Sequence, residues 1–110
     1  MTTKKVNERK SSDYKVFLTK RLQDPEMAAG YLTASFEEGE EAFLLAIKDV
    51  AEARGGIGSL AKATALNREG LYDMLSKKGN PRLSSLSTIL EALGMTLAFT
   101  PKLHGTKAVI

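Results

Sequence analysis

The chain has 110 residues, of which 43% are hydrophobic and 26% charged, as in an ordinary soluble protein with one hydrophobic core. No stretch approaches the roughly 20 consecutive apolar residues of a membrane span, and "MTTKKVNERKSSD" has no apolar run after its charges, so we expect neither a membrane anchor nor a secretory signal. Because cysteine is absent, there is no disulfide framework and no thiolate metal site, and cysteine usage does not indicate the redox compartment. A cytoplasmic protein is the default expectation.

The formal net charge of +3 is distributed unevenly along the chain. Residues 1–23 carry +5, residues 24–54 carry −6, and residues 57–83 carry +3. One acidic and one basic block predict two surfaces that meet different partners. Residues 1–12 are polar and are expected to form a flexible N-terminal arm, outside a domain that covers residues 13–101.

Three helices are predicted in the first half of that domain. Residues 14–22 form a short helix with Leu18 and Leu22 on one face, or alternatively a strand at Tyr14-Val16-Leu18. Asp24 as N-cap and Pro25 at the first helical position begin a second helix, which Gly39 ends. A third helix follows over about residues 40–54, and we expect Gly55-Gly56-Ile57-Gly58 to be the loop that ends it.

The stretch "GSLAKATALNREGLYDMLSKKGNPRLSSL" contains two short helices separated by Ala65-Leu66-Asn67. Ser59 is the predicted N-cap of the first helix and Asn67 that of the second, whose Leu71, Met74 and Leu75 face inward. Gly79 stops the second helix.

A last helix, capped by Ser84 and closed by Gly94, precedes the end of the domain. The alternation in "MTLAFTP" then predicts a strand over about residues 95–100, before a tail at 102–110. A lone strand leaves its backbone groups unpaired, so we expect it to pair with a second copy of the chain in a homodimer.

Two helices this short are held by their neighbours, and a three-residue turn makes them cross steeply so that one projects from the body. A projecting helix with a polar outer face fits the major groove of B-DNA, which is about 12 Å wide. Leu60-Ala61, Leu66 and Leu71 resemble the helix-turn-helix of lambda-repressor-like (Xre/Cro-type) proteins, over about residues 57–79. Those proteins usually have glycine where this chain has Ala65, so a slightly altered turn is expected.

The motifs "AAGYL", "DVAEARGG", "NREGLYDMLSKKGNPRLSSL" and "EALGM" together resemble the addiction-module antidote family, DNA-binding antitoxins of the HigA type. The resemblance covers roughly Asp13 to Pro101. The predicted elements, with this resemblance, give an all-α bundle of about five helices with a C-terminal dimerising strand. The resemblance itself implies the function, which is that of a homodimer that represses its own operon and neutralises a small basic toxin, typically RelE/HigB-like. A repressor of Xre type without a toxin, and an interaction module that no longer reads DNA, are the alternatives.

The candidate DNA-binding residues are Ser59, Asn67, Arg68, Glu69, Tyr72, Lys77 and Lys78. Arg68 is expected to bond guanine in the major groove, and Glu69 to accept from cytosine or to restrain Arg68. Tyr72 contacts phosphate or a thymine methyl, or else covers the helix edge. Lys77 and Lys78 are expected to meet phosphates, although lysines also favour a helix C-terminus for its dipole. As N-caps, Ser59 and Asn67 direct free N–H groups outward, where they suit phosphate.

The remaining polar residues give no sign of catalysis, of a metal or of another cofactor. The only histidine, His104, lies after Pro101 without neighbouring carboxylates. The acidic run Glu37-Glu38-Gly39-Glu40-Glu41 is either a solvated corner or a docking surface for a basic partner. Met27, Met74 and Met95 are expected to fill the core. The sequence therefore predicts a binding protein and not an enzyme.

Overall fold

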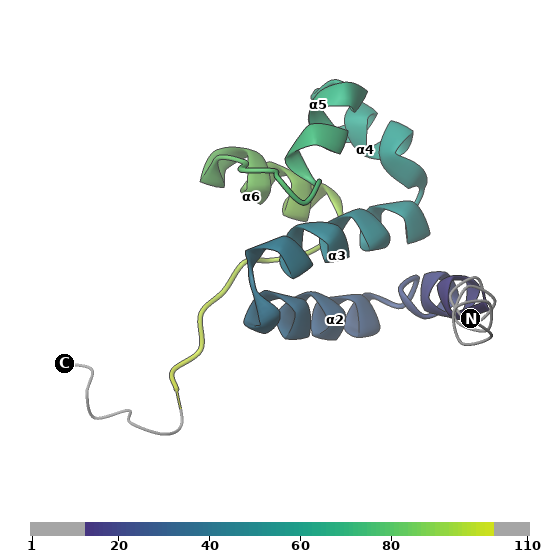
Figure 1. Ribbon diagram of the computed structural model, residues 1–110, viewed down its shortest axis with the longest axis vertical. Coiled ribbons are helices and arrows are strands. Elements are labelled where there is room, and N and C mark those ends of the chain that lie inside the picture. The colour runs from purple at the N-terminus through teal and green to yellow at the C-terminus, as the bar shows by residue number, and fades with distance from the viewer. Residues whose placement is uncertain (1–12, 103–110) are drawn as a thin grey trace, which may run out of the picture.

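The computed structural model describes residues 13–102, and helices are the only regular secondary structure among them (Figure 1). A first helix covers residues 13–21, so this segment is not the alternative strand. Five further helices follow it: α2 (Pro25–Glu38), α3 (Glu40–Ala53), α4 (Gly56–Thr64), α5 (Arg68–Met74) and α6 (Leu83–Ala92). The predicted arm at 1–12, and the tail with His104 from residue 103 on, lie outside the described residues.

The start of α2 confirms the predicted cap. Asp24 accepts a hydrogen bond through Oδ1 from the backbone N–H of Glu26 at 2.9 Å, and Pro25 occupies the first helical position. Gly39 ends α2 with a φ of 140° and at once begins α3, so the two helices form a tight hairpin. Because glycine adopts this conformation without a steric penalty, no linker residue is needed between α2 and α3.

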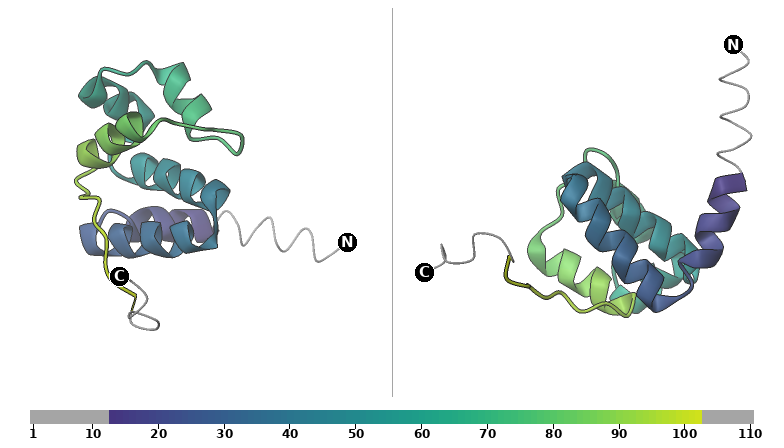
Figure 2. Two further views of the ribbon diagram at one scale, coloured as in Figure 1. Left: turned by 90° about the vertical axis from the view of Figure 1, so that its left-hand side faces the viewer. Right: turned by 90° about the horizontal axis from the view of Figure 1, so that it is seen from below.

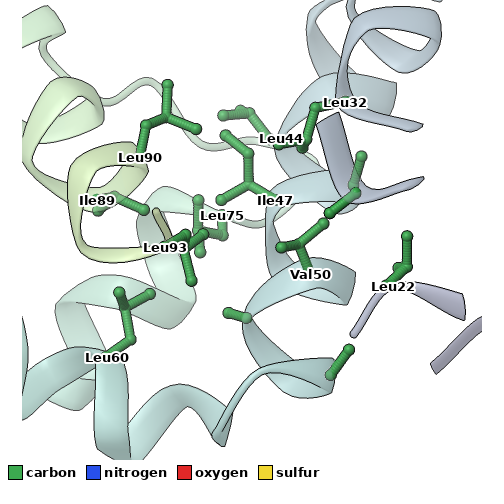
Figure 3. Packing of buried hydrophobic residues seen from close by; sticks show 14 of the residues in the cluster. Leu22, Leu32, Leu44, Ile47, Val50, Leu60, Leu75, Ile89, Leu90 and Leu93 are labelled. Atoms are coloured by element: carbon green, nitrogen blue, oxygen red, sulfur yellow. The ribbon is translucent and has the colours of Figure 1, made fainter. Parts of the chain in front are cut away.

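The third helix, α3, is the centre of the molecule. Its neighbours are α2 on one side and the α4–α6 group on the other (Figures 1 and 2). Apolar side chains from every layer converge on it, and Ile47, Val50 and Ala51 have no exposed surface (Figure 3). The remaining buried apolar side chains include Leu22, Leu32, Leu44, Ile57, Leu60, Leu71, Leu75, Ile89, Leu90 and Leu93. One continuous core therefore joins the acidic α2–α3 layer to the two short helices.

The predicted strand at 95–100 is absent from the described residues, which is a correction. After α6, Gly94 takes a φ of 81° and the Met95 N–H donates to the Leu90 carbonyl at 2.8 Å, and residues 95–102 then have no regular structure. Leu97 and Phe99 are exposed, Phe99 to 92%. The segment is not a strand in one chain because no strand among residues 13–102 pairs with its backbone.

Two predicted helix starts were also wrong. The loop expected at Gly55–Gly58 is the beginning of α4, with Gly55 as its N-cap at a φ of 116°, so Ser59 lies inside the helix. Similarly, α6 begins at Leu83 after Arg82, and Ser84 is its second residue. Neither helix start has a side-chain hydrogen bond. For α4, burial of Ile57 fixes the boundary in place of a polar cap.

One of the three methionines expected in the core is not there. Met74 and Met95 pack against the core, but the side chain of Met27 is 44% exposed. Its sulfur accepts a hydrogen bond from Arg21 Nη2 at 3.2 Å. Met27 faces the first helix instead of α3, and this places it on an open surface.

Candidate nucleic-acid interface

The two short helices α4 and α5 contact each other and are joined by three residues, as the sequence predicted. They lie at the end of the molecule opposite α2 (Figure 1). Thr64, the last residue of α4, donates through Oγ1 to the Leu60 carbonyl at 2.8 Å and accepts from the Leu66 N–H at 3.3 Å. These bonds bind the turn to the end of α4 and limit the directions in which α5 can leave.

Ala65 gives this turn its direction. It has a φ of 62° and a ψ of 20°, and it is the one non-glycine residue with positive φ in the described part of the chain. This left-handed conformation is the one that glycine adopts at helix ends. Ala65 therefore performs the turn that glycine usually makes, at a cost of roughly 1 kcal/mol of backbone strain.

The start and inner face of α5 are firmly held. Asn67 accepts through Oδ1 from the Gly70 N–H at 2.6 Å, which confirms the predicted N-cap. Leu71 and Leu75 have no exposed surface, and Met74 is partly buried against the core. A side chain at Gly79 would clash with the Met74 carbonyl, so the chain passes close to the end of α5. The helix cannot roll without exposing these leucines.

The opposite face of α5 is exposed, and the structure brings several of the predicted residues together there. Arg68, Glu69 and Asp73 are exposed along it. Tyr72 is 40% exposed, and its ring lies 5.6 Å from Lys48 Nζ of α3, so one side of the ring has a cationic neighbour. The guanidinium of Arg68, the carboxylate of Glu69 and the Tyr72 hydroxyl are hydrogen-bonding groups of the kind that contact base edges in a groove.

The segments next to α5 carry exposed lysines, although α5 itself carries two acids and one base. Lys77 and Lys78 are exposed in the loop just after α5, where the chain has left the helix, and Lys62 is exposed on α4. Ser59 is exposed, but as an interior residue of α4 it caps no helix. Its predicted role of directing N–H groups is therefore wrong, and only its hydroxyl is available for a contact.

Sequence reasoning missed the contacts of two residues in this region. The hydroxyl of Thr64 holds the turn, and sequence reasoning did not single it out. Lys48 lies 24 residues before Tyr72, and no local pattern indicates their contact. The left-handed conformation of Ala65 did have a signal, because glycine is usual at that turn position.

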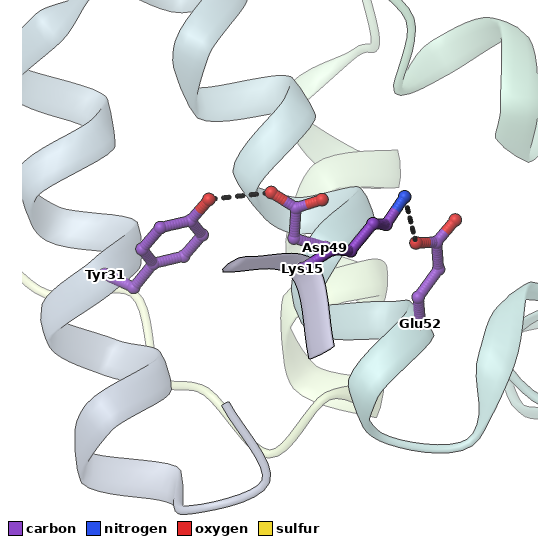
Figure 4. A network of polar contacts seen from close by, with 4 residues as sticks. All are labelled: Lys15, Tyr31, Asp49 and Glu52. Carbon is purple, nitrogen blue, oxygen red and sulfur yellow. Dashed lines mark hydrogen bonds and ion pairs between the residues drawn. The ribbon is translucent and has the colours of Figure 1, made fainter. Parts of the chain in front are cut away.

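A second exposed surface lies at the other end of the molecule, between the first helix and α2. It is a groove of about 300 Å³ lined mainly by apolar side chains. Beside it, the Tyr31 hydroxyl donates to Asp49 Oδ2 at 2.7 Å and Lys15 Nζ lies 3.9 Å from Glu52 Oε1 (Figure 4). Partial burial, and then the bond to the Asp49 carboxylate, raise the pKa of Tyr31 well above its ordinary value.

Two kinds of site are not found among residues 13–102. No three or more histidine, cysteine, aspartate or glutamate side chains gather there in a way that would hold a metal ion. No helix in the same range is both long and apolar enough to cross a membrane.

The described residues form an all-helical domain with a short helix exposed at one end. The family described as "Probable addiction module antidote protein" matches residues 13–101, and the chain belongs to this family. A Haemophilus influenzae protein described as "Uncharacterized protein" is 36% identical over 59 residues, which cover 54% of this chain and 60% of the relative. The match thus spans less than two thirds of that relative, and no solved structure matches the chain.

Proposed function

We propose that this antidote binds the operator of its own operon as a homodimer, represses transcription, and neutralises a small basic toxin of the RelE/HigB-like kind. The proposal of DNA binding is supported by how α5 is held and which of its faces is exposed. Its inner leucines are fully buried, its N-terminus is capped by Asn67, and its outer face is open. A helix held in this way can enter a major groove without rearrangement, which lowers the entropic cost of binding.

The roles of the side chains in this proposal follow their positions. Arg68 and Glu69, in the first turn of α5, read base edges, and Tyr72 contacts the DNA with the ring side that Lys48 leaves open. Lys77, Lys78 and the Ser59 hydroxyl meet phosphates. Asn67 acts by holding the helix start. Lysines meeting phosphates add affinity without sequence information, whereas a bidentate arginine–guanine contact discriminates by roughly 1–3 kcal/mol.

The homodimer is proposed to form through residues 95–100. This segment leaves the body at the end opposite the first helix, with Leu97 and Phe99 exposed (Figure 1). Pairing with the same segment of a second copy would satisfy its backbone groups and cover both side chains. Such a dimer would present two copies of α5 to half-sites about one helical turn apart.

Fluorescence anisotropy with the gene's own upstream DNA and a scrambled duplex, across a salt series, tests the proposal. Arg68→Ala should lose discrimination at one base pair per half-site. Lys77→Ala should weaken binding to both duplexes and reduce the magnitude of the salt slope by about one. The same behaviour of both variants on both duplexes would contradict the division of roles, and no binding by the wild type would contradict the DNA-binding function.

The toxin part has its own test. Co-expression with the product of the adjacent gene should restore growth and yield a stable complex. Family membership favours this reading over a repressor without a toxin. Operator binding without growth rescue would favour the repressor.

A further inference from the structure

The groove between the first helix and α2 leaves large apolar side chains uncovered. Phe17 is 55% exposed on one wall and Met27 is 44% exposed on the other, with Leu18 and Tyr31 toward the interior. Arg21 reaches across, with its guanidinium carbon 5.3 Å from the centre of the Phe17 ring and Nη2 bonded to the Met27 sulfur. These side chains form a shallow binding surface of the kind that receives an apolar anchor from a partner.

Gly30 lines the same groove from the middle of α2. An added Cβ there would meet nothing within 4 Å, and the residue has no positive φ. Neither a turn nor internal packing therefore requires glycine, and glycine in a helix interior costs stability relative to alanine. A group from outside the chain that approaches α2 closely would explain the open space.

The outward side of α2 next to this groove is uncharged. From Met27 to Phe36 the helix has no charged residue, and Thr33 and Ala34 are exposed. The opposite side of α2 packs on α3 through Ala28, Leu32 and Ser35. Surface helices normally carry charge on the face that water covers, so this stretch has the composition of an interface although none of residues 13–102 covers it.

The charges beside the groove differ between its two walls. Helices α2 and α3 carry seven acidic residues and one lysine, with Glu26, Glu37 and Glu38 of α2 exposed at the two ends of the uncharged stretch. The first helix carries Lys15, Lys20 and Arg21 against Asp13. On the α2 side a nucleic acid would be repelled, whereas a protein with lysine or arginine around an apolar anchor would be attracted.

The position of this groove and of the uncharged stretch of α2 argues against a second copy of the chain as the partner that binds there. It lies on the far side of α3 from α5 in both orientations of the molecule (Figures 1 and 2). A two-fold pairing through α2 would place the two copies of α5 at opposite poles, where they could not enter neighbouring half-sites on one duplex. It would also bring like-charged α2 helices together.

We propose that the first-helix/α2 groove, with the uncharged stretch Met27–Phe36 of α2, is the docking surface for the toxin, which inserts an apolar side chain beside Gly30 and presents basic residues to the acidic rim. This inference rests on the proposed antitoxin function. It implies that toxin and operator are bound at opposite ends of the molecule, so that a complex of all three can form.

The test uses full-length antidote and the co-expressed product of the adjacent gene, with affinity measured after separation and reassembly. Gly30→Arg places a long charged side chain in the groove without an internal clash and improves helix propensity, so the fold is kept. Gly58→Arg is the matched control, because an added Cβ in α4 also meets nothing within 4 Å. Operator binding and light scattering are measured for each protein in parallel.

We expect Gly30→Arg to weaken toxin binding about tenfold or more, as for a residue at the centre of an interface, while Gly58→Arg binds toxin like the wild type. Wild-type affinity of Gly30→Arg for toxin would overturn the proposal. A dimer disrupted by Gly30→Arg would overturn it too, since a second copy would then occupy the groove. A wild type that binds neither toxin nor operator would contradict the proposed function itself. That result differs from wild-type toxin affinity of the variant and from a disrupted dimer.

Discussion

Ala65 holds a left-handed conformation that costs an alanine roughly 1 kcal/mol and a glycine almost nothing. We therefore expect Ala65→Gly to raise the free energy of unfolding by about 0.5–1 kcal/mol, after subtraction of the larger entropy that glycine adds to the unfolded chain. Chemical denaturation followed by circular dichroism measures this change. Ala63→Gly, two residues earlier on the exposed side of α4, should lower stability by up to about 1 kcal/mol. Loss of stability in both variants would contradict the strain at Ala65.

Tyr31 also contributes to the stability of the fold, and its contribution depends on pH. Its hydroxyl donates to Asp49 at 2.7 Å, and its pKa is raised above the ordinary value of 10.0. A raised pKa means that the folded state favours the protonated hydroxyl of Tyr31. The stability that Tyr31 contributes is therefore fully present below about pH 10 and is lost as the pH rises further.

We expect Tyr31→Phe to destabilise the fold by about 0.5–1.5 kcal/mol at pH 7, the usual value of one hydrogen bond. The difference from the wild type should shrink above about pH 10, because ionisation of the unfolded wild type then opposes folding. Denaturation curves at pH 7, 9 and 11 test this. A difference that is constant over the series would contradict the assignment of the bond to the neutral hydroxyl.

At the scale of elements, two helices depend on side-chain caps of the same kind. Asn67 caps α5 and Asp24 caps α2, each by one hydrogen bond from a nearby backbone N–H. Replacement of either by alanine should cost about 1 kcal/mol of stability, within a range of 0.5–2.

Their effects on operator binding should differ. Asn67→Ala frays the start of α5, where Arg68 and Glu69 lie, and should lower operator affinity, whereas Asp24→Ala should leave it unchanged. Thermal unfolding and anisotropy on the same samples compare the two. Equal loss of affinity in both variants would show that the Asn67 cap has no separate part in binding.

The same caps explain which helix boundaries were predictable. Asp24-Pro25 and Asn67 act on residues two and three positions ahead, so the sequence alone indicates α2 and α5. The starts of α4 and α6 have no side-chain cap, and the nearest serines, Ser59 and Ser84, misled the prediction because burial and backbone conformation set those boundaries. Of the candidate site, the exposure of Arg68 and the burial of Leu71 followed from helical spacing, while the Lys48–Tyr72 contact did not.

At the scale of the whole molecule, residues 95–100 after α6 have exposed apolar side chains and no regular structure in one chain. Phe99 is 92% exposed, so Phe99→Asp should change the stability of the monomer by less than about 0.5 kcal/mol. If the proposed pairing of residues 95–100 is correct, the variant should dissociate to monomers and bind the operator more weakly. Sedimentation equilibrium measures the first effect, with Thr100→Asp as a control on the alternate side of the segment. A dimer that persists in Phe99→Asp would place the dimer contact elsewhere.

The sequence by itself determined the order of the helices between residues 13 and 94, the caps of α2 and α5, and the separation of an acidic block at 24–54 from a basic block at 57–83. These properties depend on residues a few positions apart, whose interactions are the same in most folds. Only the tertiary structure decided that Lys48 lies beside Tyr72, that Met27 and Phe17 line an open groove, and that Phe99 is exposed. These properties depend on contacts between distant segments, since burial and steric freedom exist only once the helices have packed.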